Sequence, residues 1–241
     1  MGEARVHYEF SDGIAVIRID DGKRNALPPA AFHELNAAFD RAEADQAIVI
    51  LTGREGVFSA GYDLKVLRGG GPQALNMVRL GYSLTPRVLS FPYPVITACS
   101  GHALAMGVFL MLCSDYIIGT RGEFKVAANE VALGLPMPRV GAAVLRHRLT
   151  PAAFERVVNL SEYFPVEEAR DAGFFDEVVT PDQLMARARA HAAAYAELDM
   201  RAHAATKRRI RRELIRTLRR SVWVDVAEAA WLGLQAARRK G

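Results

Sequence analysis

The segment Ser100–Asp115, SGHALAMGVFLMLCSD, most constrains what this chain can fold into. Its small residues come first and give way to an apolar run, a pattern that predicts a tight turn feeding directly into a buried helix. The first backbone N–H groups of a helix have no intrahelical acceptor, and the positive end of the helix dipole reinforces them. The turn is therefore suited to hold an anion or a polarised carbonyl oxygen.

A second turn of this kind lies upstream. The segment Phe58–Lys65, FSAGYDLK, follows the apolar strand VILTG and contains Ser-Ala-Gly and then an Asp. Its backbone is also expected to turn sharply and to offer free N–H groups ahead of a helical segment. One donor from each turn would make an oxyanion hole.

At these residues the chain resembles the crotonase (enoyl-CoA hydratase/isomerase) family. The hallmark segments stand at Ala60–Lys65, Gly101–Gly107 and Ala128–Arg139, and the likeness runs from about Val6 to about Lys207. The resemblance implies an α/β fold, a crotonase-like spiral of β-β-α units with a C-terminal helical region that helps to build trimers. It specifies the reaction less well, because this family hosts many reactions on coenzyme A thioesters.

Local patterns agree with this plan and indicate a spiral core over residues 1–180 and a helical region over 181–241. Strands are expected over residues 14–19, 47–51, 95–99, 116–119 and 123–126. A helix is expected to begin near Pro28, and others at Thr150-Pro151 and Thr180-Pro181. Gly173 is expected to end a helix, and Pro86 to bend one. The segment Arg68–Gln73, RGGGPQ, is typical of a flexible loop.

Charge is concentrated near the C-terminus. The formal net charge of +4 comes largely from the run KRRIRRELIRTLRR at Lys207–Arg220. Ile210, Leu214 and Leu218 form one apolar stripe within it, which favours an amphipathic helix with a solvated basic face. RNA binding is the alternative, but the run lacks the interleaved aromatic residues that stack on single-stranded bases.

Composition and the distribution of apolar residues indicate the compartment of the protein and the cofactors it would use. The N-terminus lacks the apolar core of a signal peptide and no run of eighteen apolar residues occurs, so a cytoplasmic protein is expected. Cys99 and Cys113 stand in apolar settings and are expected to be buried thiols. No metal site is expected, and coenzyme A would enter only as part of the substrate.

The resemblance assigns the oxyanion donors to the backbone N–H groups of Tyr62 and Met106. The plainer alternative is that both are large residues near a turn. Glu130 is the catalytic candidate because it is an acid in an apolar run, and its burial should raise its pKa toward neutrality. Its alternative role is to cap the nearby turn or to pair with Arg139.

Phe109 narrows the expected reaction. Hydratases of the family carry a second glutamate at this position, and two carboxylates can polarise a water for addition to a double bond. A single acid can still move a proton between two carbons, as in the family's isomerases with one glutamate. The expected activity is conversion of 3-enoyl-CoA to 2-enoyl-CoA in fatty acid metabolism. An enoyl-CoA hydratase and a noncatalytic acyl-CoA or RNA-binding protein are the alternatives.

The resemblance also implies where coenzyme A binds. The turn Lys23–Leu27 is expected to contact adenine through its main chain, and Lys65 to approach the phosphates. Lys207 is expected to reach coenzyme A on a neighbouring subunit of a homotrimer or a dimer of trimers. The coenzyme A candidates are Lys23, Arg24, Ala26, Ala60, Lys65 and Lys207.

Three further polar residues are expected to serve the structure. Asp63 is interpreted as a helix cap, His102 as a hydrogen-bonded packing residue, and Asp115 as a capping or core-satisfying acid.

Overall fold

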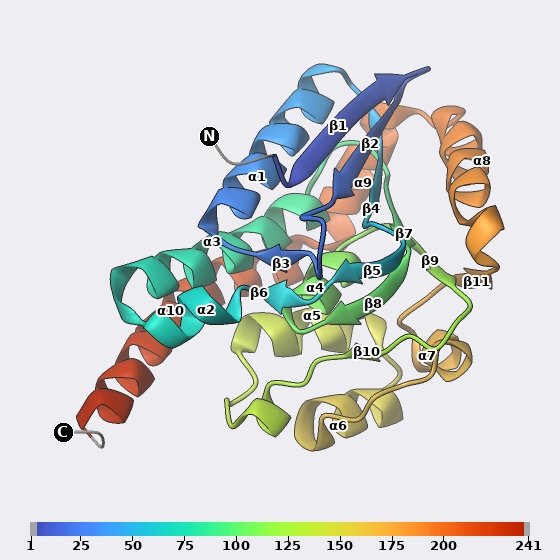
Figure 1. Cartoon of the computed structure of the whole chain (residues 1–241). Helices are drawn as coiled ribbons and strands as arrows, with labels where there is room; N and C mark the ends of the chain where they lie inside the picture. Colours follow the sequence, from blue (N-terminus) through green and yellow to red (C-terminus); the bar gives the residue numbers. More distant parts are fainter. Residues whose placement is uncertain (1–3, 239–241) are drawn as a thin grey trace.

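A six-stranded sheet forms the centre of the molecule (Figure 1), in a computed structural model that describes residues 4–238. Its strand order is β1-β2-β4-β7-β9-β11, with β1 antiparallel to β2 and the other neighbours parallel. The strands are β1 (Val6–Ser11), β2 (Ile14–Ile19), β4 (Ile48–Thr52), β7 (Val95–Cys99), β9 (Tyr116–Thr120) and β11 (Glu177–Val179). The strands predicted near residues 14–19, 47–51, 95–99 and 116–119 are thereby confirmed.

Both faces of this sheet are buried. In β2, Ile14 and Val16 pack with residues of α8 (Leu184–Ala196), whereas Ala15 and Ile17 belong to the larger core on the opposite face. That core also holds buried residues of α1 (Pro29–Ala44) and α4 (Met106–Leu112). A parallel strand that is covered on both sides needs apolar residues in succession, which explains the near-continuous apolar runs of β2, β4 and β7.

Short strands stand beside the main sheet and carry the turns singled out above. β5 (Gly56–Ser59), β8 (Gly101–Leu104) and β10 (Val126–Ala127) form a parallel sheet in the order β10-β8-β5, and β3 (Ala26–Leu27) pairs with β6 (Gly61–Tyr62). The chain thus repeats a long strand, a short strand and then a helix, as in β7, β8 and α4. This repeat is the expected spiral of β-β-α units.

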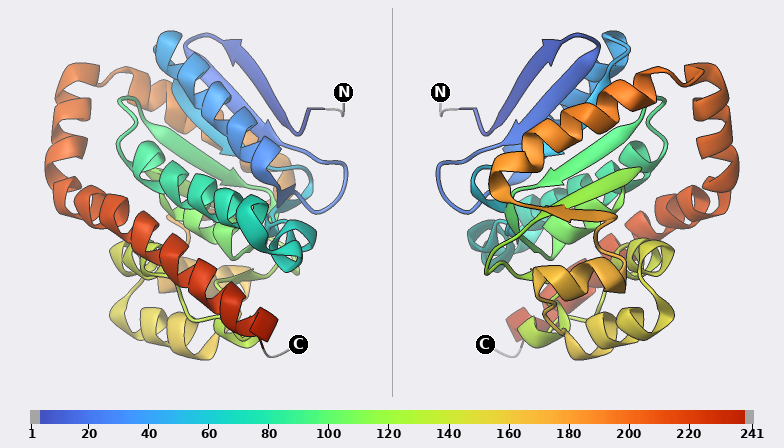
Figure 2. Two further views of the ribbon diagram at one scale, coloured as in Figure 1. Left: turned by 90° about the vertical axis from the view of Figure 1, so that its left-hand side faces the viewer. Right: turned by 90° about the vertical axis from the view of Figure 1, so that its right-hand side faces the viewer.

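The remaining helices complete the fold. They are α2 (Leu64–Gly69), α3 (Gly71–Leu89), α5 (Arg139–Arg148), α6 (Pro151–Leu160), α7 (Val166–Ala172), α9 (Met200–Ile210) and α10 (Arg212–Arg238), with short 3-10 turns η1 (Val131–Leu133) and η2 (Pro181–Gln183). The long α10 folds back across its own chain and packs against α3 and α5 (Figure 2, left). No helix of residues 4–238 is long and apolar enough to span a membrane.

Several predicted helix ends are confirmed. The Thr150 hydroxyl accepts a hydrogen bond from Ala153 N–H at the start of α6, and Gly173 closes α7 with a φ of 100°. Pro86 lies inside α3, and the bend expected there stays a prediction. Thr180-Pro181 begins the 3-10 turn η2, and α8 starts directly after it.

Three local predictions are wrong. The strand expected over residues 123–126 is instead the two-residue β10 at Val126–Ala127. Arg68–Gln73 is not a loop, because α2 runs to Gly69 and α3 begins at Gly71, with only Gly70 breaking the helix. Ile210 does not share a buried stripe with Leu218, since Ile210 is 73% exposed. The break between α9 and α10 at Arg211 shifts the helical register. Leu218 is therefore buried together with Ile215 and Val222, and not with Ile210.

Candidate active site

The two predicted turns lie against each other. Gly61 has a φ of 82°, and a Cβ atom placed on it would lie 2.8 Å from Leu104 O and 3.1 Å from Met106 N. Its lack of a side chain is what allows this approach. The main chain next to Tyr62 therefore touches the first residue of α4.

A strained residue starts α4. Ala105 adopts φ 49° and ψ −123°, a conformation that residues other than glycine rarely adopt. Its N–H donates to Ala127 O at 2.9 Å, and its own carbonyl accepts from Val108 and Phe109. The Met106 N–H has no acceptor among residues 4–238 and is free to hold an outside oxygen.

The side chain of Tyr62 is held by contacts inside the protein. Its hydroxyl donates to Val78 O at 3.0 Å, and its ring packs against Phe32 and Tyr82 with centroids 5.6 Å and 5.9 Å away. Burial raises the pKa of the Tyr62 phenol well above its usual value. The Tyr62 hydroxyl is therefore committed to an internal hydrogen bond, and the predicted role of its backbone N–H stays a prediction.

Asn25 holds the first turn in place, a role that the sequence did not reveal. It is fully buried with a φ of 52°. Its side-chain amide donates to Ile19 O, Val57 O and Phe58 O at 2.8, 3.2 and 3.1 Å. The Ser59 hydroxyl donates to Asn25 O and accepts from Gly61 N–H, which links Asn25 to the glycine of the site.

Replacing Asn25 by alanine is expected to lower the free energy of unfolding by about 2 to 4 kcal/mol, because buried carbonyl oxygens lose their donor. Asn25→Gly removes the same hydrogen bonds but tolerates the positive φ, so it separates the hydrogen bonds from backbone strain. Urea denaturation of both variants measures the difference. A loss in Asn25→Gly below about 1 kcal/mol would contradict the assigned hydrogen bonding.

Strand pairing brings the segment just before Glu130 to the second turn. β10 pairs with β8, and Glu130 follows β10 by three residues. Its side chain is 8% exposed, and its Oε2 has no hydrogen-bond partner among the described residues. Burial raises the pKa of Glu130 to about 7, an effect that a hydrogen bond from its own backbone partly opposes.

Arg139 does not pair with Glu130. Its guanidinium lies 3.1 Å from Asp225 Oδ1 and also contacts Glu228, both from α10. The charge of Glu130 contributes to the raised pKa values of Tyr62 and Tyr82, so its carboxyl lies within electrostatic range of both rings. The predicted burial is confirmed, and the alternative of an ion pair with Arg139 is wrong.

The residues that follow Glu130 expose apolar side chains, and Phe109 is buried against α5. Val131, Leu133 and Leu135 follow it directly and are 43%, 52% and 40% exposed. Phe109 is 1% exposed, and a Cβ placed on Gly141 would lie 2.5 Å from Phe109 Cζ. Phe109 is thus a buried ring packed against Gly141 of α5.

The candidates for coenzyme A fall into two places. Ala26 pairs with Gly61, and Arg24 O accepts from Ala60 N–H at 3.0 Å, so the turn at Lys23 and the first oxyanion turn form one surface. Lys65 is exposed at the start of α2. These residues are therefore near one another, and Lys207 is elsewhere.

The expectation for Lys207 does not fit the structure. Its side chain is 3% exposed, and its Nζ lies 2.5 Å from Asp115 Oδ2 and donates to Tyr93 O at 3.2 Å. Asp115 also pairs with Arg211 at 2.9 Å. The Lys207 ammonium is committed to this internal ion pair, so it does not extend toward a neighbouring subunit.

The plainer interpretations of three polar residues are confirmed. The Asp63 carboxylate accepts from Lys65 N–H at 2.8 Å and caps α2. His102 accepts from Lys125 N–H at 2.9 Å through Nδ1. Asp115 accepts from Val95 N–H at 2.7 Å in addition to its ion pairs. Cys99 and Cys113 are buried free thiols, as expected.

Comparisons with known proteins agree with the fold and show the family of the chain. The family model described as enoyl-CoA hydratase/isomerase matches residues 9–241. A crystal structure of an enoyl-CoA hydratase/isomerase family protein from Pseudomonas syringae is 43% identical, with a TM-score of 0.91 over 92% of this chain and 97% of the other. The apo structure of an enoyl-CoA isomerase from Mycobacterium tuberculosis is 41% identical, with a TM-score of 0.89 over 93% and 99%.

A curated relative carries a different reaction in its name. A probable enoyl-CoA hydratase of Mycobacterium tuberculosis is 30% identical over 81% of this chain and 76% of its own length. The spiral core and its paired turns define an enzyme of the crotonase superfamily. Within that class, the chain belongs to the enoyl-CoA hydratase/isomerase family.

Proposed function

We propose that this enzyme isomerises 3-enoyl-CoA to 2-enoyl-CoA, with Glu130 as the only acid/base. The observation that carries the proposal is the buried Glu130 carboxyl, whose Oε2 has no hydrogen-bond partner among residues 4–238. The family resemblance adds that Phe109 stands where hydratases carry a second glutamate. The apolar rim after Glu130 suits an acyl chain.

The proposed mechanism uses one proton. The Glu130 carboxylate removes a proton from C2, and the electron pair of that C–H bond spreads over the C3–C4 double bond and the thioester. The Tyr62 and Met106 N–H groups stabilise the negative thioester oxygen. Protonated Glu130 then gives the proton to C4, which leaves the double bond between C2 and C3. A carboxyl with a pKa of about 7 suits both steps, because it is a usable base and a usable acid near neutral pH.

The turn at Lys23, Arg24, Ala26 and Ala60 is proposed to hold the adenine end of coenzyme A, with Lys65 at its phosphates. These residues lie on the surface beside the first donor turn, whereas Lys207 is withdrawn from this proposal. A homotrimer or a dimer of trimers in the cytoplasm remains part of the proposal by family likeness.

Hydration of 2-enoyl-CoA is the second candidate, since a relative bears that name. The test is to incubate purified protein with 3-enoyl-CoA and with 2-enoyl-CoA and to measure both rates. We expect isomerisation to exceed hydration by at least about 10²-fold, because one carboxylate and a phenyl ring hold water poorly. A hydration rate equal to or above isomerisation would overturn the assignment, and turnover of neither would favour a noncatalytic binder.

The pH profile provides a separate prediction. The base is active when ionised, so kcat/KM for isomerisation should rise tenfold per pH unit below about 7 and level off above it. Steady-state rates between pH 5 and 9 measure this. The range extends well to both sides of 7 because carboxyl pKa values in folded proteins vary by roughly 1 unit. A profile that is flat from pH 5 to 7 would show that the reacting base is not Glu130 in this environment.

A further inference from the structure

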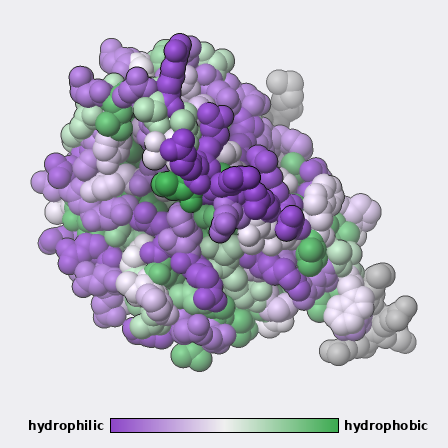
Figure 3. Space-filling view, turned by 180° about the vertical axis from the view of Figure 1, so that it is seen from behind, coloured by the Kyte–Doolittle hydropathy of each residue, from purple (hydrophilic) through white to green (hydrophobic). Residues whose placement is uncertain are grey.

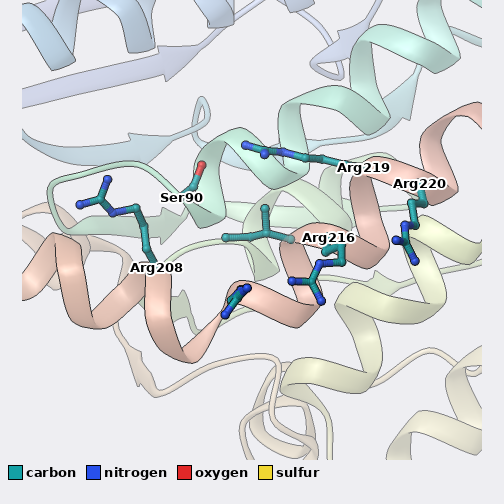
Figure 4. A pocket seen from close by; sticks show the side chains of 7 residues that line it. Ser90, Arg208, Arg216, Arg219 and Arg220 are labelled. Atoms are coloured by element: carbon teal, nitrogen blue, oxygen red, sulfur yellow. The ribbon is translucent and has the colours of Figure 1, made fainter.

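A hollow of about 410 Å³ lies between the end of α3 and the junction of α9 with α10 (Figure 4). It is lined by Ser90, Ile215, Arg208, Arg212, Arg216, Arg219 and Arg220, and we call it the arginine hollow. In Figure 4, Arg208 and Arg219 lie on two sides of Ser90, and Arg219 extends toward it. The face seen from behind, where α9 lies in Figure 1, carries dense hydrophilic side chains (Figure 3).

The five arginines of the hollow lack acidic partners. Eight other arginines form ion pairs with carboxylates, but none of these five does so within the part of the chain that the structure describes. Glu213 is exposed on α10 beside them and forms no ion pair with any of the five. Arg208 donates from Nε to Ala204 O at 3.3 Å, and its two terminal nitrogens, like the guanidinium groups of the other four, have no carboxylate partner among the described residues and can bind an outside anion.

The spacing of these arginines brings their positive charges close together. Arg212, Arg216 and Arg220 follow each other at intervals of four on α10, and Arg208 precedes them at the end of α9. Like charges four residues apart repel on a helix, and positive charge near a helix N-terminus is also unfavourable. A bound anion would relieve both effects.

The lining indicates the chemistry of the anion. Guanidinium groups match phosphate oxygens in a bidentate manner, and the Ser90 hydroxyl offers a further donor. The volume is in the range of small-molecule sites. No aromatic side chain lines the hollow, so it has no surface on which a base would stack. Recognition would therefore rest on phosphate groups.

We propose that the arginine hollow binds a small soluble anion with two or more phosphate groups, at a site separate from Glu130. Isothermal titration calorimetry with inorganic tripolyphosphate at about 0.15 M ionic strength provides the test. The variant combines Arg212→Gln, Arg216→Gln and Arg219→Gln in the full chain. The matched control combines Arg189→Gln, Arg201→Gln and Arg209→Gln, which removes three exposed charges outside the hollow.

Tripolyphosphate is expected to bind wild type and the control alike and to bind the hollow variant at least tenfold more weakly. ATP in a second arm distinguishes the source, since tighter binding than tripolyphosphate would indicate a nucleotide and equal binding an inorganic polyphosphate. Circular dichroism establishes that the variants are folded. Isomerase KM should be unchanged in the hollow variant.

Three results would overturn the proposal. If tripolyphosphate binding were weakened equally in the control variant, the binding would reflect nonspecific attraction to positive charge and not the hollow. A raised KM for enoyl-CoA in the hollow variant would mean that these arginines serve the substrate's own phosphates. Binding of a single-stranded RNA with no binding of tripolyphosphate would mean that the surface recognises a long polyanion. The calorimetric arms do not depend on the proposed reaction, because phosphate binding is measured without turnover; only the KM comparison requires it.

Discussion

Replacing Glu130 by glutamine is expected to lower the isomerisation rate about 10³-fold, because glutamine cannot carry the proton. The same change is expected to stabilise the protein at pH 8. The folded-state pKa of about 7 lies above the ordinary value of 4.5. The folded protein therefore binds more protons between these values, and its stability falls as pH rises from about 4.5 to about 7.

Above that range a buried carboxylate remains charged, which we estimate lowers stability by about 2 to 3 kcal/mol. Glutamine removes this charge, so we expect the melting temperature at pH 8 to rise by about 5 °C. The gain should vanish near pH 4. Glu123→Gln, an exposed carboxyl on the segment leading to β10, is the matched control and should change neither rate nor stability. A Glu130→Gln enzyme with an undiminished rate would remove this residue from the mechanism.

Gly61→Ala is expected to lower isomerisation about 10²- to 10³-fold, the size of effect seen when one oxyanion donor is lost. The added Cβ would press against Leu104 O and the Met106 N–H, separating the two turns. The positive φ and the overpacking together should also lower the free energy of unfolding by about 2 to 4 kcal/mol.

Gly56→Ala separates these causes. Gly56 has a φ of 81°, nearly that of Gly61, but a Cβ there would meet nothing within 4 Å. This control should lose about 1 kcal/mol of stability from the backbone alone and keep its activity. Steady-state rates and urea denaturation of both variants measure the difference. Equal losses of activity in the two variants would mean that backbone strain, and not the contact between the turns, limits the rate.

The order of the elements followed from the sequence because apolar runs and turn residues act locally. The strand over residues 14–19 and the helix after Pro28 need only their own neighbours, so pattern and capping rules identify them. Glu130 was identified in the same way, since an acid in an apolar run must be buried or used.

Other features depend on contacts between distant segments, which no local pattern reveals. Asn25 looks like a turn residue, yet its amide reaches Val57 and Phe58 more than thirty residues away. Lys207 reads as a free basic side chain until Asp115, ninety-two residues earlier, is placed beside it. Ile210 fits an apolar stripe only if α9 and α10 form one helix, and the break at Arg211 arises where the chain turns onto α3.

The most direct measurement is a crystal structure with a saturated acyl-CoA, which binds without reacting. We predict that the thioester oxygen lies about 2.7 to 3.1 Å from both the Tyr62 and the Met106 nitrogen atoms. A Glu130 oxygen should lie about 3 to 3.5 Å from the C2 and C4 carbons. A thioester oxygen bound outside this pair of amides, or a Glu130 carboxyl turned away from the acyl carbons, would contradict the mechanism.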